Sequence, residues 1–269
     1  MPTPMISWAG SWNQTEERSM AGHSKWKNIQ HRKSAQDAKR GKIFTKLIKE
    51  LTVAARMGGG DADANPRLRV AIANARSSGM PKDNIERAVK KGSGGLEDEQ
   101  FEEILYEGYG PHNVAVIVEA MTDNRNRTIA SVRYAFSKNG GNLGTTNSVQ
   151  YMFDRIGEIR IGKDVIDEDR LTELVLDAGA EDIETDDTEE FRILTTTEDC
   201  ENVRSFLEEQ EVAMRSAGMV WNPQNRVEVD DPKHAEQVIR LIDMLEDDDD
   251  VQSVHSNFDV SEAVIAQLG

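Results

Sequence analysis

Basic side chains are concentrated in one quarter of the sequence, where they could bind a polyanion. Residues 20–92 contain 17 Lys and Arg against 6 Asp and Glu, a net charge of +11. Residues 93–269 contain 14 against 41 and residues 1–19 contain 1 against 2, so the chain as a whole has a net charge of −17. Salt screens charges beyond about 8 Å, so the local excess decides the partner. The pattern predicts a segment that neutralises the phosphates of a nucleic acid.

The candidate contacts follow from residue type. Each Lys or Arg that binds a phosphate releases condensed counterions, which adds affinity that salt removes. Trp26 lies between two lysines and suits stacking on an exposed base of single-stranded RNA, although packing against a helix explains it equally well. The predicted nucleic-acid-binding residues are His23, Lys25, Trp26, Lys27, His31, Arg32, Lys33, Lys39, Arg40, Lys42, Lys46, Lys49 and Arg56. No helix has the side chains expected for reading base edges, so contacts to the phosphate backbone should dominate.

Two other interpretations of the basic face are weaker. The first is an ordinary helix surface that only faces water, but a net charge of +11 over residues 20–92 is larger than such a surface needs. An amphipathic helix lying on anionic lipid would need a stronger aromatic and apolar face. Small residues such as Ala54 and Ala55, with Phe44 the one aromatic nearby, argue against a lipid surface.

Catalytic and metal-binding patterns are missing from the sequence. It contains none of the phosphate-loop, dinucleotide, nucleophile-elbow or zinc-protease motifs. Asp61-x-Asp63-x-Asn65 imitates the start of a calcium loop, but Pro66 stands where that loop needs glycine. The five histidines lack zinc-type partners at ligand spacing, and the acidic run 246–250 is expected to be a solvated helix end. We therefore expect no enzymatic activity, no metal and no cofactor.

The sequence contains few features that indicate a cellular compartment. Cys200 is the single cysteine, which excludes an intramolecular disulfide and fits a reducing cytosol. Neighbouring carboxylates disfavour its thiolate, so it is expected to be structural. No stretch reaches the ~18–20 apolar residues of a membrane-spanning helix, and residues 1–19 lack the features of a secretory signal.

The basic segment is expected to contain a polar arm and three helices. Residues 20–41 have little apolar surface and predict a partly ordered arm. Apolar residues then recur at helical spacing from Lys42 to Gly58. Asn65, followed by proline, caps a second helix, and a third helix ends at Gly92.

The rest of the chain alternates between strand-like and helix-like patterns. Strands are predicted at 101–109, 114–121, 149–153, 158–161, 182–184, 191–195, 211–217, 226–229 and 251–258, with residues 154–157 as a hairpin turn. Helices are predicted at 125–138, 168–177, 198–210 and 232–245.

This order predicts an α+β fold: an N-terminal three-helix domain followed by two ferredoxin-like α/β-sandwich domains, the second inserted into the first. The basic helical domain would span residues 20–94. The outer α+β domain would combine 95–147 with 220–269, and the inserted one would span 148–219. Residues 1–19 are expected to be a disordered leader or tag.

Five stretches resemble one protein family. They are MAGHSKWKNIQHRKSAQDAKRGKIFTKLIKEL (20–51), NPRLRVAIANARSSGMPKDNIERAVKKG (65–92), YEGYGP (106–111), VEAMTDNRNRT (118–128) and GGNLG (140–144). Over about residues 20–269 the chain resembles the YebC family, which includes mitochondrial translational activators of cytochrome c oxidase. The resemblance implies the same three-domain architecture. Asn113 and Asn147 depart from the glycine common in the family, and asparagine tolerates the left-handed conformation.

The resemblance implies two lines of function. Many members of the family are described as DNA-binding transcriptional regulators, and others act at the ribosome to ease elongation through stretches such as proline runs. Carried onto this chain, it implies contacts by the predicted residues from His23 to Lys49. A basic arm on an acidic body can enter an RNA-lined cleft while the body is repelled from other RNA, which favours RNA.

We therefore expect a non-enzymatic, cytoplasmic, monomeric translation factor. Its partners would be rRNA or tRNA in the ribosome, with ribosomal proteins as further partners and no membrane. A DNA-binding transcriptional regulator acting on duplex DNA is the first alternative, and a protein–protein adaptor is the second.

Overall fold

The computed structural model describes residues 36–94, 101–187 and 189–268. Its N-terminal part is a bundle of three helices, α2 (Gln36–Gly58), α3 (Pro66–Ser77) and α4 (Lys82–Ser93). Leu51, Leu68 and Ile85 belong to the common core of the bundle, because each helix is apolar on one face. Asn65 caps α3 as predicted, since its side chain accepts a hydrogen bond from the Leu68 amide.

Helix α2 begins six residues before the predicted start. The expectation of an arm over residues 36–41 is therefore wrong, while residues 20–35 of that predicted arm lie outside the described residues. The physical reason is intrinsic propensity. Residues 36–40 (Gln-Asp-Ala-Lys-Arg) are mostly good helix formers, so the helix extends where no apolar stripe marks it. Gly41, the last residue of the predicted arm, lies inside the helix at a cost of about 1 kcal/mol.

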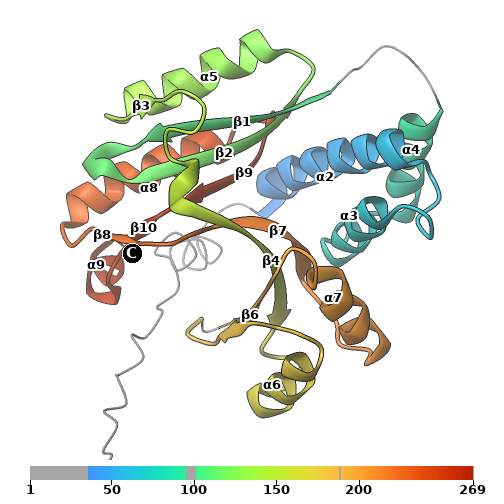
Figure 1. Cartoon of the computed structure of the whole chain (residues 1–269). Helices are drawn as coiled ribbons and strands as arrows, with labels where there is room; N and C mark the ends of the chain where they lie inside the picture. Colours follow the sequence, from blue (N-terminus) through green and yellow to red (C-terminus); the bar gives the residue numbers. More distant parts are fainter. Residues whose placement is uncertain (1–35, 95–100, 188, 269) are drawn as a thin grey trace, which may run out of the picture.

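The first α+β unit is a four-stranded antiparallel sheet with one face covered by two helices (Figure 1). The strands lie in the order β3-β1-β2-β9, and α5 and α8 supply most of the apolar side chains that cover them, including Phe136 and Leu241. A short parallel pair, β8–β10, and a last helix, α9, extend this core. The bounds are β1 (Glu102–Tyr109), β2 (Ala115–Thr122), α5 (Arg125–Lys138), β3 (Asn142–Leu143), β8 (Val227–Glu228), α8 (Pro232–Glu246), β9 (Val251–Ser256), β10 (Phe258–Asp259) and α9 (Glu262–Leu268).

The second α+β unit repeats this plan with a smaller core. Its antiparallel sheet has the order β5-β6-β4-β7. Two helices pack on one face around Ile159, Leu171 and Leu207. The bounds are β4 (Phe153–Gly162), α6 (Glu168–Asp177), β5 (Asp182–Glu184), β6 (Glu190–Thr195), α7 (Cys200–Glu209) and β7 (Ser216–Pro223). Short 3-10 turns lie at Pro111–Asn113 and Gln150–Met152.

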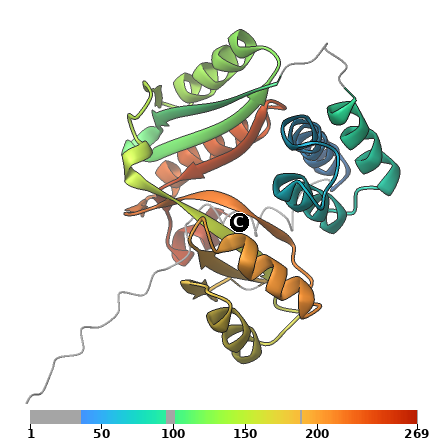
Figure 2. The same ribbon diagram turned by 45° about the vertical axis from the view of Figure 1, so that its right-hand side comes forward.

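The predicted fold class is confirmed: N-terminal helices precede antiparallel sheets in a mixed α+β fold. The chain leaves the first sheet after β3, builds the second sheet, and returns through β8 and β9 (Figure 2). The domain boundaries themselves stay a prediction. Asn113 and Asn147 have φ of 61° and 64°, so the expectation that asparagine takes the left-handed conformation at both is confirmed.

Three local predictions in the body are wrong. The hairpin predicted at 154–157 is part of one continuous strand, β4. The strand predicted from Glu211 begins at Ser216, because Glu211 has φ of 58° and the Val212 amide bonds the Leu207 carbonyl to close the end of α7. Helix α9 was not predicted at all.

Gly157 explains the hairpin error, because it allows close packing within a strand and forms no turn. A Cβ added there would lie 2.2 Å from Thr195 Oγ1 and 2.5 Å from the Cβ of Cys200. The glycine lets α7 and β6 approach β4 closely, a use of strand glycine that the sequence does not distinguish from a turn.

Substituting Gly157 with alanine should lower the free energy of unfolding by about 1–3 kcal/mol, because the new methyl group overpacks this contact. Urea denaturation measures the loss. Gly218→Ala is the matched control: Gly218 lies in the neighbouring strand β7, and a Cβ there meets nothing within 4 Å. Equal stability of the two variants would contradict the packing role of Gly157.

Candidate nucleic-acid interface

The predicted nucleic-acid-binding residues divide into those that the structure describes and those that it does not. His23, Lys25, Trp26, Lys27, His31, Arg32 and Lys33 lie outside the described residues. Lys39, Arg40, Lys42, Lys46, Lys49 and Arg56 all belong to α2. The Arg40 guanidinium lies 5.4 Å from the centre of the Phe44 ring and donates to the Gly79 carbonyl, so it also holds α2 against the α3–α4 turn.

Lys42, Lys46 and Lys49, which we call the lysine row, project from one side of α2. Their spacings of four and three residues place them on successive turns of one helix face. In the structure this face meets residues Glu246–Asp250, the acidic run, where α8 ends before β9.

Each lysine of the row holds oxygen atoms of the acidic run. Lys42 Nζ lies 2.7 Å from Asp247 Oδ1 and 3.1 Å from the carbonyl oxygen of the same residue. Lys46 Nζ donates to the Glu246 carbonyl at 2.8 Å, and Lys49 Nζ donates to the Asp249 carbonyl at 2.7 Å. The last carbonyls of a helix lack intrahelical partners and carry partial negative charge. Lys46 and Lys42 therefore satisfy the carbonyls of the last residue and the C-cap of α8, and Lys49 satisfies a carbonyl in the turn that follows.

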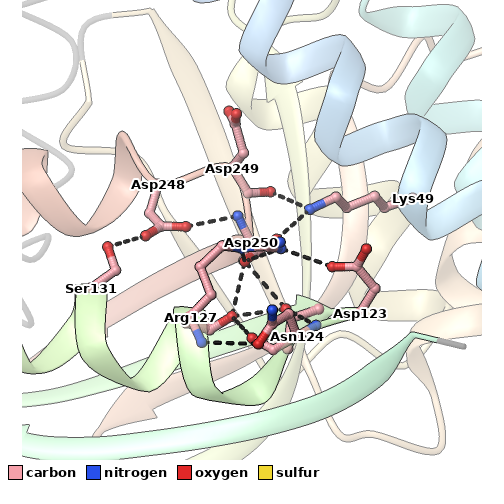
Figure 3. A network of polar contacts seen from close by, with 10 residues as sticks. Lys49, Asp123, Asn124, Arg127, Ser131, Asp248, Asp249 and Asp250 are labelled. Carbon is pink, nitrogen blue, oxygen red and sulfur yellow. Dashed lines mark hydrogen bonds and ion pairs between the residues drawn. The ribbon is translucent and has the colours of Figure 1, made fainter. Parts of the chain in front are cut away.

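Asp250 is the centre of this contact, and Figure 3 shows Lys49 and Arg127 reaching its carboxylate from two different helices. Lys49 Nζ lies 2.8 Å from Asp250 Oδ1, and Arg127 Nη2 lies 2.7 Å from Oδ2. Thr128 and Thr122 also donate to Oδ2, at 2.9 Å and 3.2 Å. The side chain is only 5% exposed, so the expectation that the acidic run is a solvated helix end is wrong for Asp250. It becomes buried because α2 and α5 close over it.

The Asp250 carboxylate stays ionised in this setting. Burial alone would raise its pKa, but hydrogen bonds from Lys49, Arg127 and Thr128 outweigh burial and hold the pKa at about 2, below the ordinary value of 3.8.

Acid should therefore weaken the fold through Asp250. Because the folded-state pKa lies below the unfolded one, the contribution of Asp250 to stability is complete above about pH 4 and is lost as pH falls to about 2. Urea denaturation at several pH values should show this loss in the natural protein and a smaller one in Asp250→Asn. An equal pH dependence in both proteins would contradict the assignment.

A cleft of about 650 Å³ lies beside this contact. It is lined by Thr45, Lys49, Phe101, Asp123, Arg127, Ser131 and Asp248–Asp250. Several of its polar side chains bond one another: Arg127 also bonds Asp123, and Ser131 bonds Asp248. The cleft therefore lies along the contact between α2 and the first α+β unit.

The described residues contain no group of three or more His, Cys, Asp or Glu side chains that could hold a metal ion. Cys200 is buried. Burial, aided by the nearby Glu201 carboxylate, raises the pKa of its thiol, which confirms the expectation of an unreactive cysteine. No helix in the described part of the chain is long and apolar enough to cross a membrane.

Sequence reasoning missed the partners of the lysine row. Asp250 and Arg127 were not among the candidate residues, and the acidic run was expected to face water. One signal was available: the stretch 118–128, noted for its family resemblance, contains Asp123, Arg127 and Thr128. These residues surround Asp250.

Two family models match the chain. The model described as "TACO1/YebC protein N-terminal domain" matches residues 24–95. The model described as "TACO1/YebC second and third domain" matches residues 101–258.

Known proteins of similar sequence extend over nearly the whole chain. A protein of Syntrophobacter fumaroxidans is 52% identical over 249 residues, which are 93% of this chain and 100% of the relative. One of Desulforapulum autotrophicum is 55% identical over 245 residues, covering 91% of this chain and 98% of the relative. Both are named "probable transcriptional regulatory protein". The crystal structure of a conserved hypothetical protein from Aquifex aeolicus is similar with a TM-score of 0.80 and 47% identity, covering 84% of this chain and 93% of that one.

Proposed function

Because the chain belongs to the TACO1/YebC family, we propose that it is a non-enzymatic, nucleic-acid-binding regulator of gene expression that contacts its target through the basic face of α2. The observation that carries the proposal is the lysine row. Its three ammonium groups hold carbonyl and carboxylate oxygens at 2.7–3.1 Å. Charge-assisted hydrogen bonds from lysine to phosphate oxygens have similar lengths, about 2.7–2.9 Å.

The acidic run competes with phosphate for these ammonium groups. A nucleic acid that reaches the lysine row must displace Asp247 and the carbonyls at the end of α8. The affinity is then reduced by the fraction of molecules in which the row is covered. The contact thus favours targets that present several phosphates at once.

RNA in the ribosome is the favoured target. Lysine is a compact point charge suited to the phosphate backbone, whereas planar bidentate groups are better suited to reading base edges. Such a row supports binding by charge and shape, as a ribosomal cleft would require. In this form of the proposal the protein is a translation factor that eases difficult elongation.

Duplex DNA is the second candidate, and the names of the relatives support it. Proteins 52% and 55% identical to this chain are named as transcriptional regulators. Contacts to the phosphate backbone serve a duplex as well as an RNA.

Sedimentation through a sucrose gradient separates the two candidates. Cell lysate is run with and without nuclease across a salt series, for the natural protein and for Lys42→Glu/Lys46→Glu/Lys49→Glu. Movement with intact ribosomes that the variant loses supports the translation factor. Retention at the top of the gradient, together with a clear preference for promoter duplexes over random DNA, supports the transcriptional regulator. If neither occurs and the variant keeps its cellular function, the adaptor alternative stands and the proposal fails.

A further inference from the structure

Helix α5 differs in charge from the rest of the body. Residues 124–153 contain four Lys and Arg and no Asp or Glu. The other residues between 93 and 269 contain 10 Lys and Arg against 41 Asp and Glu. The four basic residues all lie on α5, so this helix is a basic element of an acidic body, and we call its exposed side chains the α5 strip.

Two of the three arginines of α5 form no ion pair with the described residues, whereas the other arginines of the body are paired. All eight other arginines between residues 101 and 268 form ion pairs with carboxylates. On α5, Arg127 pairs with Asp250, but the exposed Arg125 and Arg133 form no ion pair with any described residue. Their guanidinium groups are therefore available to an external anion.

An exposed aromatic side chain completes the strip. The Tyr134 side chain is 56% exposed, and the Lys138 ammonium lies 5.4 Å from the centre of its ring. A second tyrosine, Tyr151, is 69% exposed within the same acid-free stretch. Helix α5 covers the outer side of its sheet, and Figures 1 and 2 show no other helix over its outer face. Cations beside exposed aromatic rings are the arrangement with which proteins bind unstacked bases and their phosphates.

We propose that the solvent face of α5 is a second nucleic-acid contact, which binds single-stranded RNA. Arg125, Arg133 and Lys138 hold phosphates, and Tyr134 stacks on a base. A single strand fits better than a duplex, because the faces of its bases are open to an aromatic ring. The inference rests on the proposed function and extends it from α2 to the body.

The place of α5 fits a strand that also contacts the lysine row. Arg127, in the first turn of α5, and Lys49, in the lysine row, bind the same carboxylate of Asp250. The α5 strip therefore begins where the row ends, and the helix extends it by about 21 Å at 1.5 Å per residue. An RNA that spans both should bind more tightly than one that covers the row alone.

Titration of the full chain with a fluorescent single-stranded RNA of about 20 nucleotides tests the proposal. Arg125→Glu/Arg133→Glu/Lys138→Glu should weaken binding about tenfold or more. The slope of log affinity against log salt concentration should become shallower by about 2, since three phosphate contacts are lost. The matched control is Arg170→Glu/Lys233→Glu/Arg240→Glu, which changes the charge equally at other exposed positions of the body. Circular dichroism and urea denaturation establish that both variants are folded.

Stacking is tested separately at Tyr134. Tyr134→Ala should weaken binding to the RNA about tenfold but leave binding to an abasic strand of equal length unchanged, whereas Tyr134→Phe should bind as the natural protein does. If Tyr134→Ala has no effect, or affects the abasic strand equally, the stacking role is overturned.

The outcomes separate this inference from the proposed function. If the α5 variant binds as tightly as its matched control while reversal of the lysine row abolishes binding, α5 is not a contact and the proposed function stands. If the natural protein does not bind the RNA, this inference fails together with the RNA form of the proposed function, and the duplex-DNA candidate is the one left. Equal binding of duplex DNA, lost in the α5 variant, would overturn the assignment to single-stranded RNA.

Discussion

Replacing Asp250 with alanine should lower the free energy of unfolding by about 3–5 kcal/mol, the largest stability loss that we expect from a single side chain on this surface. The carboxylate is buried between α2 and α5 and accepts hydrogen bonds from Lys49, Arg127, Thr128 and Thr122. Its removal leaves the Lys49 ammonium and the buried threonine hydroxyl groups without this acceptor. Urea denaturation measures the effect, and loss of the contact between α2 and the body should appear as faster proteolysis between them.

The neighbouring Asp249 supplies the control. Its side chain is exposed, and it binds Lys49 through its backbone carbonyl, which Asp249→Asn retains. This variant should change stability by less than about 0.5 kcal/mol. If Asp249→Asn and Asp250→Ala unfold at the same urea concentration, Asp250 is not the anchor of the contact.

Reversing the charge of the lysine row, in Lys42→Glu/Lys46→Glu/Lys49→Glu, should weaken nucleic-acid binding about 100-fold or more near physiological salt. Three phosphate contacts are lost and three repulsive charges are added. The negative slope of log affinity against log salt concentration should become shallower by about 2–3 for the same reason. Fluorescence titration with one RNA probe across a salt series measures both quantities. Because Lys49→Glu places a carboxylate against Asp250, circular dichroism and urea denaturation must first establish that the variant is folded.

A control on another helix separates this effect from general charge. Lys82→Glu/Arg87→Glu/Lys90→Glu makes the same change at exposed positions of α4 that do not contact the acidic run. It should weaken binding by much less. If both triple variants lose affinity equally, binding depends on net charge, and the lysine row has no special role.

Neutralising the acidic run should act in the opposite direction. In Asp247→Asn/Asp249→Asn, phosphate meets less repulsion, and Lys42 loses its carboxylate partner in the covered state. Affinity for the same probe should rise about three- to tenfold. Unchanged or weaker binding would show that the acidic run does not compete with nucleic acid for the row.

Much of the secondary structure could be predicted because its signals are local. Helix α6 was predicted with the bounds Glu168–Asp177 that the structure shows. The cap of α3 was predicted at Asn65, since a short polar side chain followed by proline before an apolar period is typical of a helix start. The errors arose where a residue type has two uses. Gly157 was assigned to a turn but lies in a strand, and Gly41 was assigned to the polar arm but lies inside a helix.

Only the basic half of the candidate site could be predicted from the sequence. The basic excess of residues 20–92 and the helical spacing of Lys42, Lys46 and Lys49 are properties of the sequence, because charge and period depend on neighbours along the chain. The covering of that row by residues 246–250 depends on a contact between segments about 200 residues apart, which no local pattern encodes. That Arg125 and Arg133 form no ion pair with the described residues is equally a tertiary property, because it depends on which carboxylates folding brings within reach. The sequence by itself thus determined the α+β class, the family resemblance and the basic segment. Only the tertiary structure decided which basic groups are already bound and which remain open to a partner.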